Sequence, residues 1–443
     1  MVEAELMRVS IIGTGYLGAT TAACLTDMGF EVIGVDVDEA KIDMLRSGQV
    51  PFYEPGLDEI LTENMKTGRL RFTTSFAEAA EFADLHLVCV GTPQRDDSGA
   101  ADLSYVNSAI EQLAPHLTRP TVVVGRSTVP VGTAATLAAR LATLAPVGEE
   151  AELGWSPEFL REGFGVEDTL HPNRIVIGTE SPRVEKVMRA LWQRQINEGV
   201  PFLVTDMQTA ELVKVSANAF LATKISFINA MAEVSEVAGA DVMQLAEALS
   251  YDDRIGGKFL GPGLGFGGGC LPKDIRAFMA RADELGVEPA LSFLREVDAI
   301  NQRRRARTID IARQLIGGNF AGRTVTVLGA AFKPNSDDIR DSPALDVAST
   351  IASLGARVTV YDPAALDRAR EEHPQLGYAP SMLEAAQDAD VVLLLTEWAE
   401  FREANPKKLG AVVAQKKIVD GRNALDPTYW RASGWTYRAL GRQ

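Results

Sequence analysis

The chain has 443 residues and a formal net charge of -16, with 46% hydrophobic and 23% charged residues. This length accommodates two or three domains, and the acidic balance argues against general binding to nucleic acid or to an anionic membrane. No apolar stretch approaches the roughly 18 residues of a membrane-spanning helix. The first seven residues lack a basic segment, so no secretory signal is predicted. Three cysteines and four scattered histidines indicate a reducing, cytoplasmic location and no metal site.

The first part of the chain alternates short apolar runs with helical segments. A glycine-rich turn at 13–18 separates the first run from a helix of small apolar residues at 19–28. Further runs end in turns such as Gly91-Thr92-Pro93 and Ser127-Thr128-Val129-Pro130. Such alternation predicts a parallel sheet with helices on both faces. The predicted strands cover 8–12, 31–35, 85–90 and 121–124.

The glycine-rich turn has the pattern of a dinucleotide-binding site. Gly13 allows a tight turn, Gly15 allows the pyrophosphate to approach, and Gly18 allows close packing of helix on strand. Asp36 ends the second predicted strand, where a carboxylate suits ribose hydroxyls and repels a 2′-phosphate. The sequence therefore predicts NAD rather than NADP.

A long helix over 205–239 separates this region from a second α/β region that opens near Arg323. The helix is apolar nearly all round, so we expect it to be covered on every side. The second region repeats the strand pattern of the first, but its turn at 330–334 lacks the three glycines and should bind something else. We predict two Rossmann-like, doubly wound parallel-sheet domains joined by a helical domain, with boundaries 1–204, 205–310 and 311–443.

The most distinctive segment is the glycine run from Gly261 to Gly269 that ends at Cys270. Such a run is unsuited to a hydrophobic core and should offer backbone N–H groups to a ligand. Lys273 lies three residues beyond Cys270, and a nearby cation favours the nucleophilic thiolate. We interpret Cys270 as a nucleophile, the alternative being a small buried apolar residue. Cys24 and Cys89 lie in apolar segments and are interpreted as inert core thiols.

Seven motifs in this order resemble the UDP-glucose 6-dehydrogenase family, within the larger group that includes GDP-mannose and UDP-N-acetylmannosamine dehydrogenases. They are GTGYLG from Gly13, STVPVGT from Ser127, SPEFLREG from Ser156, ELVKVSANAF from Glu211, GFGGGCLPKD from Gly265, AFKPNSDDIRDSP from Ala331 and DGRN from Asp420. The resemblance implies a four-electron oxidation of a nucleotide-sugar at C6, with two NAD consumed and a thioester on the cysteine. It also implies a homodimer through the long helix.

The resemblance assigns roles residue by residue. Lys214 and Asn218, four apart on the predicted helix, share a face and can stabilise an oxyanion. The implied catalytic residues are Cys270, Lys214, Asn218, Glu158 as general base, and Asp274 and Thr128 around the attacking water. The implied cofactor contacts are Gly13, Gly15, Leu17, Gly18, Asp36, Lys41, Thr92, Thr128, Glu162, Lys273 and Arg340. The implied substrate contacts are Glu158, Phe159, Leu160, Arg161, Glu162, Lys214, Asn218, Arg254, Phe259, Leu260, Gly261, Pro262, Gly263, Gly267, Lys333 and Arg422.

Three alternatives stay open at the level of sequence. A GDP-mannose dehydrogenase shares most of these motifs, and Gly269 stands where a serine is frequent in the family. A two-electron dehydrogenase of a hydroxy acid would need Lys214 but not Cys270. A sensor of NAD or of a nucleotide-sugar would not need Cys270, Lys214, Asn218 and Glu158 together.

Overall fold

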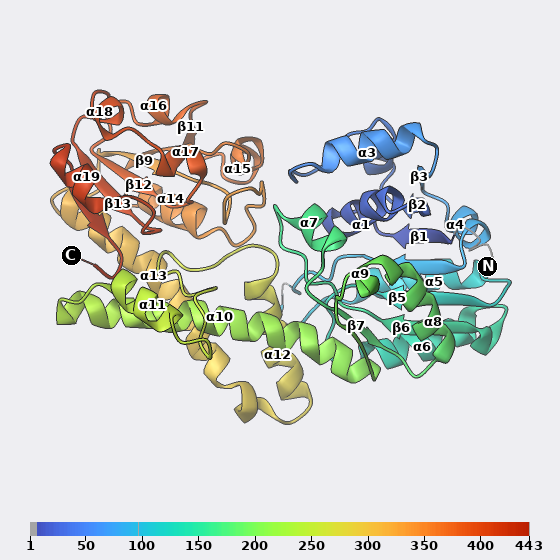
Figure 1. Cartoon of the computed structure of the whole chain (residues 1–443). Helices are drawn as coiled ribbons and strands as arrows, with labels where there is room; N and C mark the ends of the chain where they lie inside the picture. The colour runs from blue at the N-terminus through green and yellow to red at the C-terminus, as the bar shows by residue number, and fades with distance from the viewer. Residues whose placement is uncertain (1–6, 96, 443) are drawn as a thin grey trace. The chain divides into compact units, whose positions relative to one another are not determined.

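The computed structural model describes residues 7–95 and 97–442, which form two compact units (Figure 1). Unit 1 comprises Met1–Ala217 and Arg276–Gly286, and unit 2 comprises Asn218–Ile275 and Val287–Gln443. Residues 1–6, which carry most of the segment judged not to be a secretory signal, lie outside the described part. The division into three domains stays a prediction.

Unit 1 is built on an eight-stranded sheet of order β3-β2-β1-β4-β5-β6-β7-β8. The first six strands are parallel, β6 and β7 pair antiparallel through Trp155 and Gly178, and β7 and β8 are parallel to each other. We predicted a purely parallel sheet, so the reversed direction of β7 and β8 was not predicted. The strands are β1 (Arg8–Ile12), β2 (Glu31–Val35), β3 (Leu70–Thr73), β4 (Leu85–Val88), β5 (Thr121–Gly125), β6 (Ala151–Trp155), β7 (Ile175–Gly178) and β8 (Phe202–Thr205).

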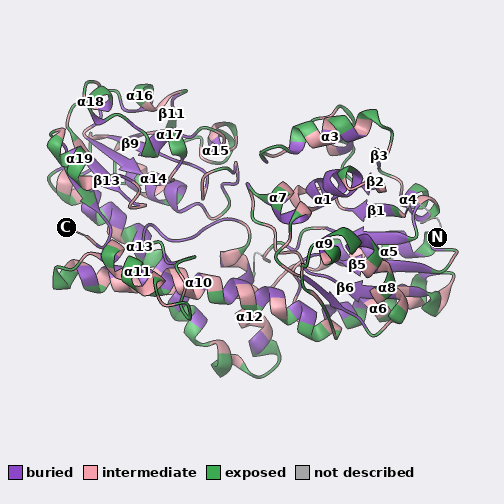
Figure 2. Ribbon diagram, in the orientation of Figure 1, coloured by how far each residue is buried: buried purple, intermediate pink, exposed green. Residues whose placement is uncertain are grey.

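Alternating side chains of these strands feed two separate cores. Ile11 packs on one face of the sheet and Ile12 on the other, as the period of two requires, and both are buried. Figure 2 shows that the labelled strands of this sheet are mostly buried. Unit 1 is therefore doubly wound. Its helices are α1 (Tyr16–Asp27), α2 (Glu39–Arg46), α3 (Leu57–Lys66), α4 (Phe76–Phe82), α5 (Ser104–Leu113), α6 (Thr133–Leu144), α7 (Gly165–Leu170), α8 (Pro182–Leu191) and α9 (Gln193–Asn197), with 3₁₀ turns at Ala114–His116 and Gly148–Glu150.

Unit 2 has a six-stranded parallel sheet of order β11-β10-β9-β12-β13-β14. This order repeats that of the first six strands of unit 1, so the predicted internal repeat is visible in the topology. The strands are β9 (Thr324–Leu328), β10 (Arg357–Tyr361), β11 (Gly377–Tyr378), β12 (Val391–Leu394), β13 (Lys417–Asp420) and β14 (Thr436–Ala439).

The acidic residue that ends the second strand of each repeat differs in its surroundings. In unit 2, Asp362 follows β10, and its Oδ2 accepts hydrogen bonds from the backbone N–H groups of Ala330 and Ala331 and from the indole of Trp398. Asp362 is 1% exposed, so its carboxylate is not available to a ribose. This burial gives a physical reason why the turn in unit 2 is not a second dinucleotide site.

The long helix predicted over 205–239 is α10 (Met207–Ala238), which carries the chain from unit 1 into unit 2. The expectation that it is covered on every side is wrong for the single chain, because Phe220, Phe227 and Val234 are 66%, 48% and 59% exposed. The other helices of unit 2 are α11 (Val242–Ser250), α13 (Phe293–Leu315), α14 (Pro343–Ser353), α15 (Leu366–Glu372), α16 (Met382–Ala385), α17 (Ala399–Arg402), α18 (Pro406–Leu409) and α19 (Pro427–Ala432), with a 3₁₀ turn at Glu288–Leu291. Helix α12 (Leu271–Glu284) begins in unit 2 and ends in unit 1.

Within residues 7–95 and 97–442, none of the helices combines the length and apolar character needed to cross a membrane. The same residues contain no group of three or more His, Cys, Asp or Glu arranged to hold a metal ion.

Candidate active site

The glycine-rich turn of unit 1 joins β1 to α1 in the geometry that a dinucleotide needs. Gly13 has a φ of 92° and donates its N–H to the Val35 carbonyl at 2.7 Å, so it requires the left-handed conformation that glycine adopts freely. A Cβ at Gly18 would overlap the carbonyl oxygen of Gly13, whereas one at Gly15 would meet nothing within 4 Å. Open space therefore lies in front of Gly15, where a pyrophosphate would approach. Leu17 is half-buried in the first turn of α1.

Asp36 is fixed as an ionised carboxylate at the end of β2. Its Oδ2 accepts hydrogen bonds from the Thr14 N–H at 2.9 Å and the Thr14 hydroxyl at 3.1 Å, and it pairs with Lys41 Nζ at 3.0 Å. Burial alone would raise the pKa of Asp36, but the hydrogen bonds from Thr14, Lys41 and Asp38 outweigh it, and the net pKa is lowered. This charge and the turn together favour ribose hydroxyls over a phosphate.

A cavity of about 410 Å³ opens beside Asp36 at the carboxyl ends of β1, β2 and β4. Gly13, Gly15, Asp36 and Lys41 line it, as predicted for a cofactor site. Sequence reasoning missed other lining residues, because a single residue on α4, on α5 or after β2 belongs to no motif and gives no signal of a ligand. The missed residues include Val37, Phe76, Tyr105, Ser108 and Gln112. Shape and charge here fit NAD.

The turns after β4 and β5 are tied to each other. The Thr92 hydroxyl donates to the carbonyl of Thr128 at 2.7 Å, and the Ser127 hydroxyl donates to the carbonyl of Val90 at 2.6 Å. Both predicted threonines thus lie where the parallel strands end, the usual position of ligands in such sheets.

Glu158 and Lys214 are brought together although they are far apart in sequence. Lys214 Nζ lies 3.1 Å from Glu158 Oε1, with exposed side-chain fractions of 6% and 14%. Glu158 Oε2 also accepts the Leu160 N–H at 2.5 Å, and Lys214 lies 5.7 Å above the ring of Phe159. Each of these largely buried charges is therefore paired, as a buried ion requires.

Glu54 is a contributor that the sequence analysis missed. Its carboxylate accepts hydrogen bonds from the Tyr16 hydroxyl at 2.6 Å and from the N–H groups of Gly163 and Gly165, each at 2.7 Å. It thereby ties the glycine-rich turn to the segment that carries Glu158 and Glu162. A glutamate before Pro-Gly gave no signal of such a role.

Arg161 lies on the same segment but is engaged within the protein. Its guanidinium donates to both carboxylate oxygens of Asp168, at 2.9 and 2.6 Å. Its side chain is 54% exposed.

In unit 2, Cys270 directly precedes α12, and its carbonyl accepts the Asp274 N–H at 2.9 Å. The cysteine is exposed, and a position at a helix N-terminus favours the thiolate. Asp274, 2% exposed, accepts from Asn218 Nδ2 at 2.6 Å and pairs with Lys273 Nζ at 2.7 Å. Three predicted catalytic residues, Cys270, Asn218 and Asp274, are therefore joined within one unit.

The glycine run before Cys270 is more buried than predicted. Residues 262–268 are buried, and Leu264 belongs to the core of unit 2, so the expectation that this run is unsuited to a core is wrong. A Cβ at Gly265 would overlap the Asn301 amide, and one at Gly268 would lie 2.7 Å from the ring of Phe332. Most of these glycines serve the packing of the loop on its own protein, whereas Gly261 is exposed and open.

Further contacts hold the other predicted substrate residues of this loop. Gly263 donates its N–H to Asn229 Oδ1 at 2.8 Å, and Leu260 is 4% exposed. Phe259 is 39% exposed and has a φ of 65°, which is uncommon for a residue with a side chain. Pro262 accepts from Asn423, and a Cβ at Gly267 would overlap the backbone of Asp341.

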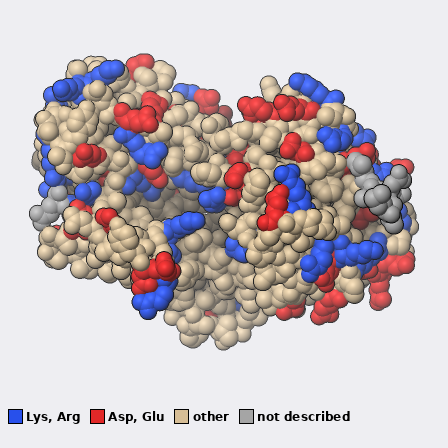
Figure 3. All heavy atoms as spheres, viewed as in Figure 1, with Lys and Arg blue, Asp and Glu red and all other residues tan. Residues whose placement is uncertain are grey.

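The predicted basic contacts of unit 2 have different surroundings. Arg422 donates to the carbonyls of Leu395 and Gly265, both at 2.7 Å, so it braces the glycine run. Arg340 pairs with Asp338, and Lys333 lies 5.5 Å above the Phe332 ring. Arg254 pairs with Asp252 and is 89% exposed. On the faces of both units that Figure 3 shows, basic and acidic side chains lie in small scattered groups among other residues.

Comparison with known proteins assigns the chain to one family. Three profiles of the UDP-glucose/GDP-mannose dehydrogenase family match the chain: the NAD binding domain over 7–196, the central domain over 208–303 and the UDP binding domain over 326–427. The chain belongs to this family. The dinucleotide turn and cavity lie within the first match, and Lys214, Asn218 and Cys270 lie within the second.

Full-length relatives agree with this assignment. The UDP-glucose 6-dehydrogenase YwqF of Bacillus subtilis is 38% identical, over 99% of this chain and 98% of its own. The UDP-glucose 6-dehydrogenase of Rhizobium meliloti is 39% identical, over 98% of this chain and 100% of its own. The structure of a UDP-glucose dehydrogenase from Pyrobaculum islandicum superimposes with a TM-score of 0.91 at 34% identity, covering 100% of this chain and 99% of that one.

Proposed function

We propose that this dehydrogenase oxidises UDP-glucose to UDP-glucuronate with two NAD per sugar. The observation that carries the proposal is that each unit holds one cluster of the expected groups: Glu158 with Lys214 in unit 1, and Asn218 and Asp274 beside Cys270 in unit 2. A two-electron dehydrogenase would need no cysteine at the start of α12. A sensor would not need a buried Lys–Glu pair, which is costly to maintain.

In the first oxidation, side chains of the protein stabilise the negative charge that develops on the alcohol oxygen as it loses its proton. The C6 alcohol gives its hydroxyl proton to a water molecule and loses a hydride, and so becomes an aldehyde. NAD, when bound, accepts a hydride in each of the two oxidations. The ammonium group of Lys214, which lies 3.1 Å from Glu158, stabilises the developing oxyanion. Asn218, one turn later on α10, supplies an amide donor.

The second oxidation depends on Cys270. Its thiolate adds to the aldehyde carbon to give a thiohemiacetal, which can lose a second hydride and become a thioester. Water then attacks the thioester carbonyl, with Glu158 as general base, and the thiolate leaves as the acid is released. The hydrogen bond from Asn218 and the ion pair with Lys273 fix Asp274 for its proposed role at that water, in which Thr128 also takes part.

We favour UDP-glucose over GDP-mannose as the substrate because relatives that align with 98% or more of this chain are named UDP-glucose 6-dehydrogenases.

A count of NADH per sugar tests the proposal. Purified protein with limiting UDP-glucose and excess NAD should release two NADH per sugar consumed, and GDP-mannose should give none. One NADH per sugar would rule out the double oxidation, and no NADH with either sugar would favour a sensor.

We further propose a homodimer formed through α10. Phe220, Phe227 and Val234 are seven residues apart and therefore share one helix face, and their exposed fractions reach 66%. A second copy of the chain could cover this face and remove its apolar surface from water.

Paired substitutions Phe227→Glu and Val234→Glu should convert the dimer to a monomer of 47.7 kDa, because four charges would face one another in the interface. Light scattering coupled to size-exclusion chromatography measures the mass. Leu383→Glu, on exposed α16, changes a comparable apolar residue outside this face and should leave the mass unchanged. A monomeric wild-type protein would contradict the proposal.

A further inference from the structure

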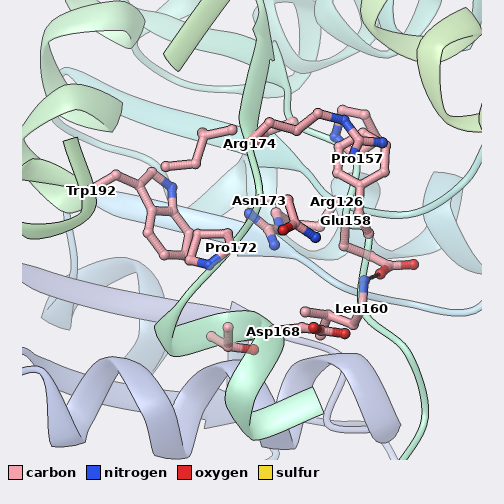
Figure 4. Close-up of a pocket in the computed structure, with 13 residues that line it drawn as sticks. Arg126, Pro157, Glu158, Leu160, Asp168, Pro172, Asn173, Arg174 and Trp192 are labelled. Carbon is pink, nitrogen blue, oxygen red and sulfur yellow. Dashed lines mark hydrogen bonds between the residues drawn. The ribbon is translucent and has the colours of Figure 1, made fainter. Parts of the chain in front are cut away.

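Unit 1 contains a small cavity of about 40 Å³ beside the segment that carries Glu158 (Figure 4). Its walls come from the residues that follow β5 and β6, the segment before β7, α7 and Trp192 after α8. One water molecule needs about 10–15 Å³ of such space, so the cavity admits a water or a small ion but not a phosphate.

Two hydrogen-bond donors on the walls have no partner. Arg126, which directly follows β5, is 5% exposed, and Trp192 is 2% exposed. Arg126 Nε and Trp192 Nε1 are both buried and form no hydrogen bond to any residue that the structure describes, and the guanidinium lies 5.8 Å from the indole centre. Buried donors in native proteins are almost always satisfied, so these two require an acceptor.

The charges around the cavity favour an anion over a neutral acceptor. Arg126 and Arg174 both line it, and within the described residues neither forms an ion pair with a carboxylate. Both carboxylates on the walls are already paired, Glu158 with Lys214 and Asp168 with Arg161.

Arg174 also packs over the Phe159 ring at 3.7 Å, which keeps its charge beside the cavity. Burial lowers the pKa of Arg126 by more than the nearby Cys89 thiol and Glu158 carboxylate raise it, although a guanidinium remains protonated. Buried charges are normally paired, so an acceptor that is also negative meets both requirements.

We propose that this cavity binds one small monovalent anion of the halide class. Arg126 Nε and Trp192 Nε1 donate to it, and Arg174 adds positive charge. The site shares no lining residue with the dinucleotide cavity, and it supports the backbone that presents Glu158. It does not depend on which sugar the protein oxidises.

Bromide reports directly on the site because it scatters anomalously. Crystals of the full chain transferred into sodium bromide should show an anomalous peak within hydrogen-bond distance of Arg126 Nε and Trp192 Nε1. Density at that position without anomalous signal, as a water molecule gives, would overturn the proposal.

Two variants separate a built site from an adventitious ion. Arg126→Met removes the charge and the donor while keeping an unbranched side chain, and it should abolish the peak. Trp192→Phe removes only the indole donor and should lower bromide occupancy. An equal peak in wild type and in Arg126→Met would mean an adventitious ion only.

Thermal unfolding tests the site in solution. Replacing about 100 mM sodium gluconate with sodium chloride at the same ionic strength should raise the wild-type Tm by about 2 °C, because the ion binds only the folded state. Arg126→Met should lose this difference, whereas Arg140→Gln, at an exposed position of α6, should keep it. No chloride effect on wild type, or an equal effect on Arg126→Met, would contradict the proposal.

Discussion

Replacing Cys270 with serine should lower steady-state NADH production from UDP-glucose by about 10³-fold or more, while UDP-glucose still binds with nearly unchanged affinity. A serine hydroxyl is far less ionised than a thiol near neutral pH, so addition to the aldehyde and the second oxidation both fail. Stopped-flow absorbance of NADH measures turnover, and isothermal titration calorimetry measures binding.

Cys24 provides a matched control for this variant. It is 0% exposed on α1, and burial raises the pKa of its thiol to about 12, so it is protonated and inaccessible at neutral pH. Cys24→Ala should retain full activity, and iodoacetamide should modify Cys270 before either buried cysteine, as peptide mass spectrometry would show. Full activity of Cys270→Ser would remove the nucleophile from the proposed mechanism.

Asp36→Gly should shift the cofactor preference from NAD towards NADP by about 10³-fold in the ratio of kcat/KM values. The substitution removes hydrogen bonds between a carboxylate and the ribose, each contributing about 1.5–3 kcal/mol, and a charge that would repel a 2′-phosphate. It also releases Lys41, now 3.0 Å from Asp36, to meet that phosphate. Initial rates with each cofactor at saturating UDP-glucose measure the shift.

Asp38→Ser is the control, because it removes a nearby negative charge while keeping a side chain that can cap α2. Asp38 accepts the Lys41 N–H at 3.1 Å, a role that serine can take over. This variant should alter the preference by no more than about threefold, since a solvent-exposed charge is well screened. An equal shift in both variants would show that net charge, rather than contact with the ribose, selects the cofactor.

The glycine-rich turn and Asp36 could be predicted from the sequence because their contacts are local or lie between neighbouring strands. Gly13, Gly15 and Gly18 are needed by one turn, and its pattern is visible in six consecutive residues. The alternation of strands and helices likewise follows from short-range periodicity, and it predicted both sheets. Cys270 stood out because a cysteine after a glycine run is rarely a core residue.

Only the tertiary structure decided which distant side chains meet. Glu158 and Lys214 are paired, Asn218 donates to Asp274, and Glu54 joins two segments, yet no sequence spacing encodes these contacts. Two expectations from the sequence were wrong. The glycine run is buried, because glycines leave room for Asn301 and Phe332 to pack against it, and α10 has an exposed apolar face. The physical reason is that burial and pairing depend on how the chain is packed in space. The sequence by itself determined the local geometry of the cofactor turn, and packing determined which charges are available for chemistry.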